Sequence, residues 1–308
     1  MSILRSVLLA GSQSAWLRRQ APRFWFVRKS VARFMPGESI DDALGAAAHL
    51  RDLNIRTIFT FLGENVTEPS EALKVKDHYL MVLDRIRESG LPTEISVKLT
   101  HLGLDLSQDL CYSNLARLVE RAGTKSVVWI DMESTAYVDA TLGIFHRARR
   151  AWPNVGVCVQ AYLHRTAKDL ETLVAIGAAV RLVKGAYKEP PAVAIQDKRD
   201  IDDNFFILAK RMLSPEASAA GMRAAIGTHD SRLIRRIQDW ALTNPVATKG
   251  LCEFQMLYGI QRNLQLELAR EGWKSVVLIA YGSYWFPWFM RRLAERPANA
   301  LHVVRNLF

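Results

Sequence analysis

The stretch VVLIAYGSYWFPWFMRRLAERPAN, residues 276–299, is typical of a strand, a tight turn and a helix in immediate succession. Residues 276–280 form a short apolar run of the kind that makes a buried strand. Gly282 suits the turn, and Pro287 suits the first turn of a helix, where backbone N–H groups have no intrahelical partner. The stretch therefore predicts one strand–helix unit, with the helix starting just beyond the carboxyl end of the strand.

Seven similar apolar runs precede this one, and the segments between them are long enough for a helix each. The eight predicted strands cover residues 57–62, 95–99, 127–132, 155–159, 179–183, 223–227, 251–254 and 276–280. Near-continuous apolar strands that alternate with helices indicate a parallel sheet covered by helices. Eight such units in 308 residues predict an α/β fold, a (β/α)8 TIM barrel formed by residues 38–308, rather than an open sheet.

A polar or ionisable side chain stands at the predicted carboxyl end of each strand. These side chains are Glu64, Lys98, Asp131, Gln160, Lys184, Thr228 with His229, Gln255 and Tyr281. Enzymes with this fold place their active sites at that end of the barrel. The cations of the set, together with Arg181, favour an anionic ligand, a phosphorylated cofactor, or both.

The predicted last helix carries two adjacent arginines. Trp288, Arg291, Arg292 and Glu295 follow one another at spacings that place them on one helical face. A pair of arginines there can bind a small carboxylate bidentately. A solvated surface pair is the alternative interpretation. The aromatic run before the arginines favours a partly covered face.

The positive charge of the chain is concentrated in residues 1–37, the N-terminal arm. Seven of the 41 Lys and Arg residues lie there with no Asp or Glu, so the remaining chain has 34 basic against 31 acidic residues. Aromatic residues alternate with these cations, which suits contact with an anionic membrane surface. A lid helix packed on the barrel and a transit peptide are the alternatives. The balanced body predicts no nucleic-acid binding.

Several classes of protein are excluded by missing signals. The three cysteines are far apart and lie in no CxxC or Cys/His cluster, which indicates a reducing compartment and no metal site. No apolar run is long enough to cross a membrane. GxGxxG, P-loop, HExxH and GxSxG motifs are absent from their expected places. We expect a cytoplasmic protein, with peripheral contact to the inner face of the membrane through the arm as the alternative.

Six motifs, in order, resemble those of the proline dehydrogenase family from about Phe34 to the C-terminus. They are SVKL (96–99), QAY (160–162), RLVKGAY (181–187), THD (228–230), EFQ (253–255) and RRLAE (291–295). The resemblance is to the short, single-function bacterial type. It implies a distorted (β/α)8 barrel with a helical N-terminal arm and its last helix over the strand ends. It also implies FAD as cofactor, oxidation of L-proline to 1-pyrroline-5-carboxylate by hydride transfer to flavin N5, and reoxidation by a quinone.

The resemblance further implies roles for particular residues. The substrate carboxylate would be bound by Arg291, Arg292 and Lys98, and Glu64 would pair with Arg291 as a gate. The ring pocket would be walled by Tyr187 and Leu257 and supported by Asp131. The FAD would be held by Gln160, Arg181, Lys184, Gly185, Ala186, Thr228, His229 and Glu295, with Arg181 near N5.

Two positions depart from the family pattern. Leu278 and Trp288 stand where the family usually has tyrosines that enclose the substrate ring, and Ala280 replaces a proline. A leucine removes a hydroxyl, whereas a tryptophan keeps an aromatic face and adds bulk. A substituted proline such as 4-hydroxyproline, or another cyclic imino acid, is therefore an alternative substrate to L-proline. An inactive barrel that acts as a membrane-associated binding protein is a second alternative.

Overall fold

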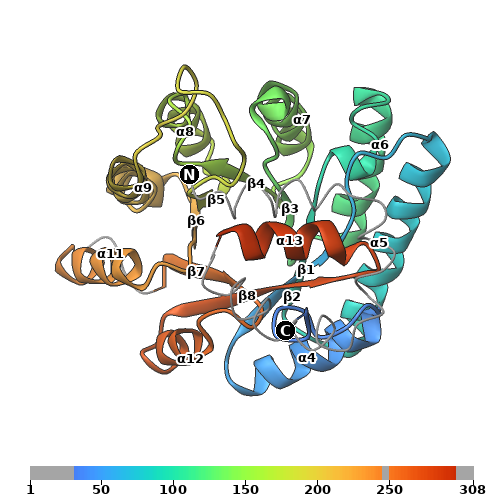
Figure 1. The fold of residues 1–308 in the computed structure, drawn as a ribbon, viewed down its shortest axis with the longest axis horizontal. Coiled ribbons are helices and arrows are strands. Elements are labelled where there is room, and N and C mark those ends of the chain that lie inside the picture. The colour runs from blue at the N-terminus through green and yellow to red at the C-terminus, as the bar shows by residue number, and fades with distance from the viewer. Residues whose placement is uncertain (1–30, 245–249, 296–308) are drawn as a thin grey trace, which may run out of the picture.

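The computed structural model describes residues 31–244 and 250–295, with side chains as far as Met290. Eight parallel strands form a closed barrel in the order β1 to β8, and β8 pairs with β1 (Figure 1). The strands are β1 Arg56–Phe61, β2 Thr93–Val97, β3 Val128–Ile130, β4 Val155–Gln160, β5 Ala179–Val183, β6 Arg223–Gly227, β7 Cys252–Leu257 and β8 Lys274–Tyr281. All eight predicted runs coincide with strands, so the predicted (β/α)8 barrel is confirmed.

Helices surround the barrel and connect successive strands (Figure 1). They are α4 Ile40–Asp52, α5 Pro69–Ser89, α6 Gln108–Ala122, α7 Val138–Ala151, α8 Thr166–Ala175, α9 Lys198–Met212, α10 Pro215–Ala219, α11 Ser231–Thr243, α12 Arg262–Arg270 and α13 Trp285–Glu295. Two short 3-10 helices, η2 Thr100–Leu102 and η3 Thr135–Tyr137, follow β2 and β3. No helix within the described residues is long and apolar enough to cross a bilayer.

Two of the three clusters of buried apolar residues lie on opposite sides of the barrel wall. The larger of these two fills the space between the outer faces of the strands and the helices. The smaller contains Ile58, Trp129, Ala179, Ala225 and Val276, which come from five different strands. Side chains of strands that are not neighbours can meet only inside a barrel, so these residues mark the inward register. Because strand side chains alternate between two faces, residues two positions away also point inward.

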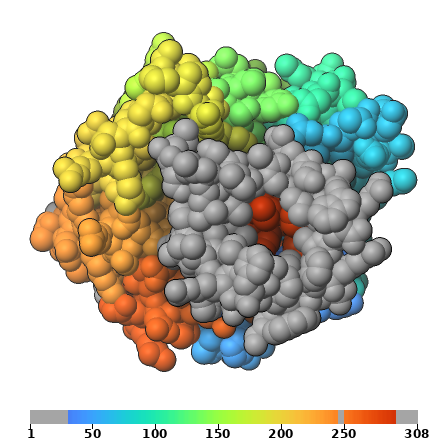
Figure 2. Space-filling model, viewed as in Figure 1, coloured from blue at the N-terminus to red at the C-terminus, as the bar shows by residue number. Residues whose placement is uncertain are grey.

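The last helix crosses the mouth of the barrel, as expected (Figure 1). Gly282 makes the turn after β8 with φ 112°, and a Cβ atom there would lie 2.8 Å from the Phe61 ring. The helix begins at Trp285, so Pro287 lies in its first turn as predicted. The aromatic side chains of α13 pack with Leu62 and Ala280 at the strand ends. In Figure 2, a small part of α13 is visible near the middle of this face of the molecule.

Two of the predicted strand-end residues are placed differently by the structure. Gln255 lies within β7, two residues before its end, and is buried. Tyr281 is the last residue of β8, and its hydroxyl lies 2.8 Å from Nε2 of His78 on α5, so it points away from the barrel interior. The prediction was wrong for Tyr281 because an apolar run does not reveal which face its last residue occupies.

Candidate active site

Six of the predicted site residues share the inward register at the carboxyl half of the barrel. Asp131 lies two residues beyond the interior Trp129, and Leu278 packs against the interior cluster itself. The same alternation directs Lys98, Gln160, Arg181 and Leu257 into the barrel. Residues that lie up to 180 positions apart in the sequence are therefore brought to one mouth.

Arg181 is at the centre of a buried polar cluster. Its side chain is 4% exposed. Its Nη1 donates to Asp131 Oδ1 at 2.7 Å and to Ser96 Oγ at 3.0 Å, and its Nε donates to Gln255 Oε1 at 2.5 Å. Ser96 Oγ also donates to Asp131 at 2.7 Å. Side chains from β2, from β7 and from the residue after β3 thus fix this guanidinium.

Two buried polar atoms at this mouth have no partner among the described residues. They are Nη2 of Arg181 and Oε1 of Gln160. Gln160 is 2% exposed, and its Nε2 donates to the backbone oxygen of Glu133 at 3.2 Å. A buried polar group without a hydrogen bond is costly, so such groups indicate a place where a ligand binds. One of the two atoms offers a donor and the other an acceptor.

Lys98 and Glu64 form an ion pair at the rim. Lys98 Nζ lies 2.6 Å from Glu64 Oε2, and the two side chains are 18% and 20% exposed. The predicted gate paired Glu64 with Arg291 instead. The side chain of Arg291 lies outside the described residues, so that pairing remains a prediction. The observed pair already places Glu64 beside the expected carboxylate site.

Behind this pair lie two titratable groups, His101 of η2 and Glu133 in the loop after β3, which are buried without a directly bonded opposite charge in the described part of the chain. Burial, followed by the nearby charge of Lys98, lowers the pKa of His101 to about 4. Burial raises the pKa of Glu133, although its hydrogen bonds from the backbone and hydroxyl of Thr100 oppose that effect. The His101 ring packs so closely on Gly63 that a side chain there would overlap it. These contacts fix the loop that carries Glu64.

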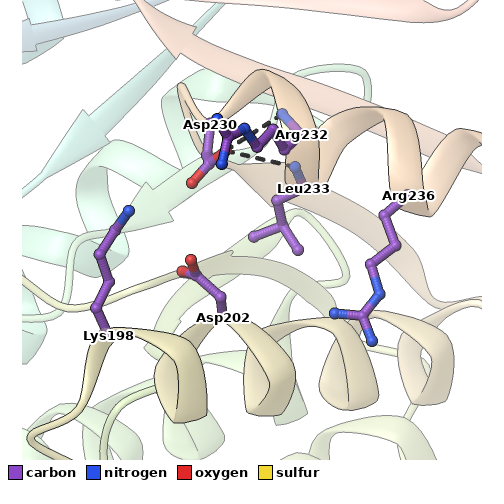
Figure 3. Close-up of a pocket in the computed structure, with 6 residues that line it drawn as sticks. All are labelled: Lys198, Asp202, Asp230, Arg232, Leu233 and Arg236. Atoms are coloured by element: carbon purple, nitrogen blue, oxygen red, sulfur yellow. Dashed lines mark hydrogen bonds between the residues drawn. The ribbon is translucent and has the colours of Figure 1, made fainter.

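A second charged cluster surrounds Lys184, immediately after β5. Its Nζ contacts Asp202 of α9 and lies 2.8 Å from Asp230 Oδ2, at the start of α11. Burial alone would raise the pKa of Asp230, but the hydrogen bond and charge of Lys184 lower it overall. Both carboxylates also line an open cavity of about 390 Å³ between α9 and α11 (Figure 3). Its other lining residues are Lys198, Arg232, Leu233 and Arg236.

The loops after β5 and β6 place the remaining predicted cofactor residues next to this cluster. Thr228 is buried, and its Oγ1 accepts a hydrogen bond from the backbone of Asp230 at 3.2 Å. His229 Nε2 accepts from the backbone N–H of Leu257 at 2.9 Å, which ties the β6 loop to the end of β7. Because that nitrogen accepts, the imidazole proton is on Nδ1.

Gly185 has φ 113°, and a Cβ atom there would overlap the Tyr162 ring, so the turn after Lys184 requires glycine. Ala186 is exposed and Tyr187 half-buried. These two residues follow the turn toward the rim.

The apolar part of the mouth lies between β7 and β8. Leu257 and Leu278 are register neighbours, and both are partly exposed. Trp288 is 8% exposed and belongs to the cluster that joins α13 to Leu62 and Ala280. Of the residues that depart from the family pattern, Leu278 thus lies in the barrel wall on β8, and Trp288 lies on α13, which covers the mouth. Arg291, Arg292 and Glu295 lie in α13, but their side chains fall outside the described residues.

Sequence reasoning did not assign a role to several residues that the structure brings to the site. Ser96 and Gln255 bind Arg181, and Asp202 and Asp230 bind Lys184. Ser96, Gln255 and Asp230 were part of recognised motifs, and the first two also share the inward register of their strands. Asp202 lies within a helix and gave no comparable signal.

A protein-family model described as proline dehydrogenase matches residues 43–305. Proline dehydrogenase 1 of Bacillus subtilis (strain 168) is 36% identical over 306 residues, which cover 99% of each chain. The proline dehydrogenase of Deinococcus radiodurans is 34% identical over 281 residues, or 89% of each chain.

Among solved structures, proline utilization A from Bdellovibrio bacteriovorus, inactivated by N-propargylglycine, superposes with a TM-score of 0.81 at 23% identity. The match covers 95% of this chain and 36% of that one. The corresponding protein of Corynebacterium freiburgense gives 0.71 at 20% identity, with 98% and 34% covered. The chain thus spans about a third of the length of these larger proteins, and the likeness supports the barrel fold.

Proposed function

The chain belongs to the proline dehydrogenase family, and from this premise we propose that it oxidises L-proline to 1-pyrroline-5-carboxylate. FAD is the proposed hydride acceptor, and a quinone is the proposed final electron acceptor. The observation that carries the proposal is the mouth of the barrel, where Arg181 and Gln160 each hold one buried polar atom without a described partner.

The residues at the mouth fit a flavin. A flavin ring has acceptors at N5 and its carbonyl oxygens and a donor at its imide N–H, so it can satisfy both a buried guanidinium N–H and a buried amide oxygen. We assign the ring to Arg181 and Gln160. The rest of the cofactor is assigned to Lys184, Gly185, Ala186, Thr228, His229 and Glu295. The cavity beside Lys184 offers room on that side of the mouth.

When bound, FAD supplies the acceptor for the hydride, and the protein positions and polarises the substrate. Lys98, Arg291 and Arg292 are the proposed carboxylate clamp, which aims the reacting C–H bond. Because Lys98 is already paired with Glu64, the incoming carboxylate must compete with Glu64 for that ammonium. The neighbouring cations also lower the pKa of the substrate amine, which must be neutral to release hydride.

The wall of the pocket favours an unsubstituted ring. Leu257 and Leu278 offer no hydrogen-bond partner, so a 4-hydroxyl group directed at them would be buried unsatisfied. Such burial costs about 1–3 kcal/mol in proteins. Tyr187 and Trp288 complete the proposed enclosure. We therefore propose L-proline ahead of 4-hydroxyproline.

The proposed location is the cytoplasm, with peripheral contact to the membrane where a quinone acceptor is dissolved. The support for this contact is the composition of residues 1–37, in which cations alternate with aromatic residues. Residues 1–30 lie outside the described residues.

The test is an anaerobic titration of the purified protein with L-proline, followed at the visible flavin band. We expect a yellow protein whose band is bleached stoichiometrically by L-proline. D-proline, with its carboxylate on the wrong side of the ring, and 4-hydroxy-L-proline serve as matched controls and should bleach it weakly.

Each other outcome selects an alternative. A yellow protein that 4-hydroxyproline bleaches and L-proline does not would assign the site to a substituted ring. A colourless protein that takes up no FAD would overturn the flavoenzyme proposal and favour the inactive, membrane-associated binding protein.

A further inference from the structure

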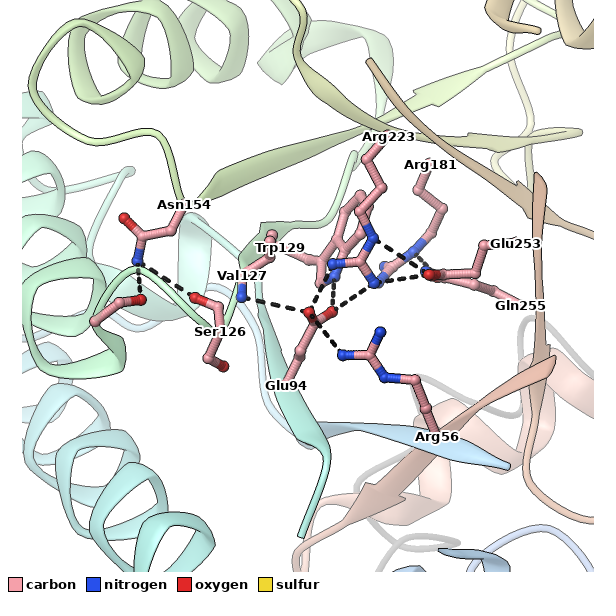
Figure 4. Close-up of polar contacts among 11 residues, drawn as sticks. Arg56, Glu94, Ser126, Val127, Trp129, Asn154, Arg181, Arg223, Glu253 and Gln255 are labelled. Atoms are coloured by element: carbon pink, nitrogen blue, oxygen red, sulfur yellow. Dashed lines mark hydrogen bonds and ion pairs between the residues drawn. The ribbon is translucent and has the colours of Figure 1, made fainter. Parts of the chain in front are cut away.

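A chain of hydrogen bonds runs through the barrel interior from Arg181 to the opposite end of the barrel. Gln255 links Arg181 to Glu253, because its Oε1 accepts from Arg181 Nε and its Nε2 donates to Glu253 Oε1, both at 2.5 Å. Glu253 Oε2 then accepts from Arg223 Nη2 at 2.8 Å, and Arg223 Nη1 donates to Glu94 at 2.6 Å (Figure 4).

The two neighbours of Gln255 fix the orientation of its amide. A guanidinium can only donate and an ionised carboxylate can only accept, so the oxygen must face Arg181 and the nitrogen must face Glu253. No other side chain of this length offers both groups. Gln255 is 4% exposed, so water does not replace either bond readily. Gln255 therefore restrains the Nε edge of Arg181, while Asp131 and Ser96 hold its Nη1 edge.

We propose that Gln255 is a positioning residue that aims the free Nη2 of Arg181 at the flavin and so raises the reduction potential of the cofactor. This inference rests on the proposed function. A flavin gains negative charge when it is reduced, and a fixed cation beside it stabilises that charge. A guanidinium that loses its restraint at Nε can turn away, which weakens the stabilisation. The remaining bonds to Asp131 and Ser96 keep it inside the barrel.

The chain contains the same arrangement a second time, away from the site. On the outer helix α11, Gln238 accepts from Arg235 Nη1 at 2.9 Å and donates to Glu271 Oε2 at 3.0 Å. Gln238 is also buried, at 3% exposed. A substitution at Gln238 thus removes the same kind of bonds from a similarly buried glutamine without touching the barrel interior, although the side chains of its partners Arg235 and Glu271 are 39% and 37% exposed. It separates loss of stability from loss of positioning.

The experiment measures the two-electron midpoint potential of the bound flavin in Q255M, Q255N and Q238M. Q255M removes both hydrogen bonds, and Q255N is too short to span Arg181 and Glu253. We expect both to lower the equilibrium constant for flavin reduction about tenfold, which is ~30 mV for a two-electron couple. Q238M should leave the potential unchanged.

Q255N keeps the test decisive should Q255M fail to fold. Flavin-bound Q255M or Q255N with an unchanged potential would show that Gln255 is only structural. An equal shift in Q238M would assign the effect to a general loosening of the protein. Each of these results overturns the inference and leaves the proposed function standing. A protein that binds no flavin overturns both.

Discussion

The two ends of the barrel interior differ in how completely their buried polar groups are paired. At the end where the strands begin, Glu94 and Glu253 are 3% and 2% exposed, and Arg223 lies between them and binds both. Trp129 Nε1 donates to Glu94 at 2.8 Å, and Arg56 approaches the same carboxylate at 3.8 Å (Figure 4). We call this set of charges the floor. At the mouth, by contrast, Arg181 and Gln160 keep buried polar atoms without described partners.

Because of this difference, buried arginines at the two ends have different roles: Arg223 stabilises the fold, whereas Arg181 is a candidate for ligand binding. Burial alone would lower the pKa of Arg223, but Glu253 and Glu94 raise it overall, so Arg223 keeps its charge. Arg181 and Arg223 both lie over the Trp129 ring, at 4.8 and 5.2 Å from its centroid. Each nitrogen of the Arg223 guanidinium donates to a carboxylate, whereas Nη2 of Arg181 has no acceptor among the described residues. A buried arginine is therefore a candidate for ligand binding when its donors outnumber its partners.

The largest effect is expected from breaking the floor. E94A removes the acceptor of Trp129 Nε1 and one of the two carboxylates that bind Arg223, so we expect the free energy of unfolding to fall by about 3–5 kcal/mol. The measurement is urea unfolding followed by circular dichroism. E120A, at an exposed glutamate of α6, is the control and should change stability by less than about 1 kcal/mol. A loss below 1 kcal/mol for E94A would contradict the structural role of the floor.

The next largest effect is a loss of stability at acidic pH, which should arise from His101 behind the mouth. His101 has a pKa of about 4 in the folded protein against an ordinary 6.5, so the unfolded chain binds a proton more readily. Its stabilising contribution is complete above pH 6.5 and is lost as pH falls toward 4, by on the order of 3 kcal/mol.

Unfolding measured at several pH values tests this effect of acid. H101F, which keeps a ring against Phe61, should flatten the dependence of stability on pH between 6.5 and 4, whereas H49Q at an exposed histidine should not. If H101F and the unsubstituted protein lose stability in parallel, the acid sensitivity originates elsewhere.

A smaller effect, on activity, is expected from the rim. K98M removes one proposed contact to the substrate carboxylate, and hydrogen bonds to charged groups contribute about 1.5–3 kcal/mol. We expect kcat/KM for L-proline to fall about 10- to 100-fold. Stability should change by less than about 1 kcal/mol, because the Lys98–Glu64 pair is partly exposed. K168M, at an exposed lysine of α8, should leave both unchanged. A large loss of stability in K98M would mean that Lys98 has a structural role, as the charges of the floor do.

The sequence allowed the barrel and most of its mouth to be predicted, because strands buried on both faces leave continuous apolar runs. Lys184 and Thr228 were placed correctly after their strands for the same reason. Pairing across the interior could not be predicted, since Arg181 and Gln255 are 74 residues apart and meet only when the barrel closes. The floor was missed, although Glu94 stands out as a charge inside an apolar strand.

The smallest predicted effect concerns Glu133, and it tests whether a buried carboxyl near the mouth responds to pH. Glu133 is 5% exposed and is hydrogen-bonded to Thr100, and burial raises its pKa. A carboxyl with a raised pKa contributes stability below its ordinary pKa of 4.5 and loses that contribution as pH rises through the folded value. E133Q keeps an acceptor for Thr100 and carries no charge. Its stability relative to the unsubstituted protein should therefore increase from pH 5 to pH 8, by on the order of 1 kcal/mol.

Urea unfolding of both proteins at the two pH values gives this difference directly, with E120Q as the exposed control. A stability difference that stays constant with pH would mean that the folded protein does not raise the pKa of Glu133. The mouth would then differ from the floor only in the atoms of Arg181 and Gln160 that have no described partner. A difference that increases with pH would mean that the surroundings of Glu133 favour its neutral form, whereas the floor carboxylates are paired with Arg223. The positive charge of Lys98 would then be balanced by Glu64 alone, which is the carboxylate that the substrate must displace.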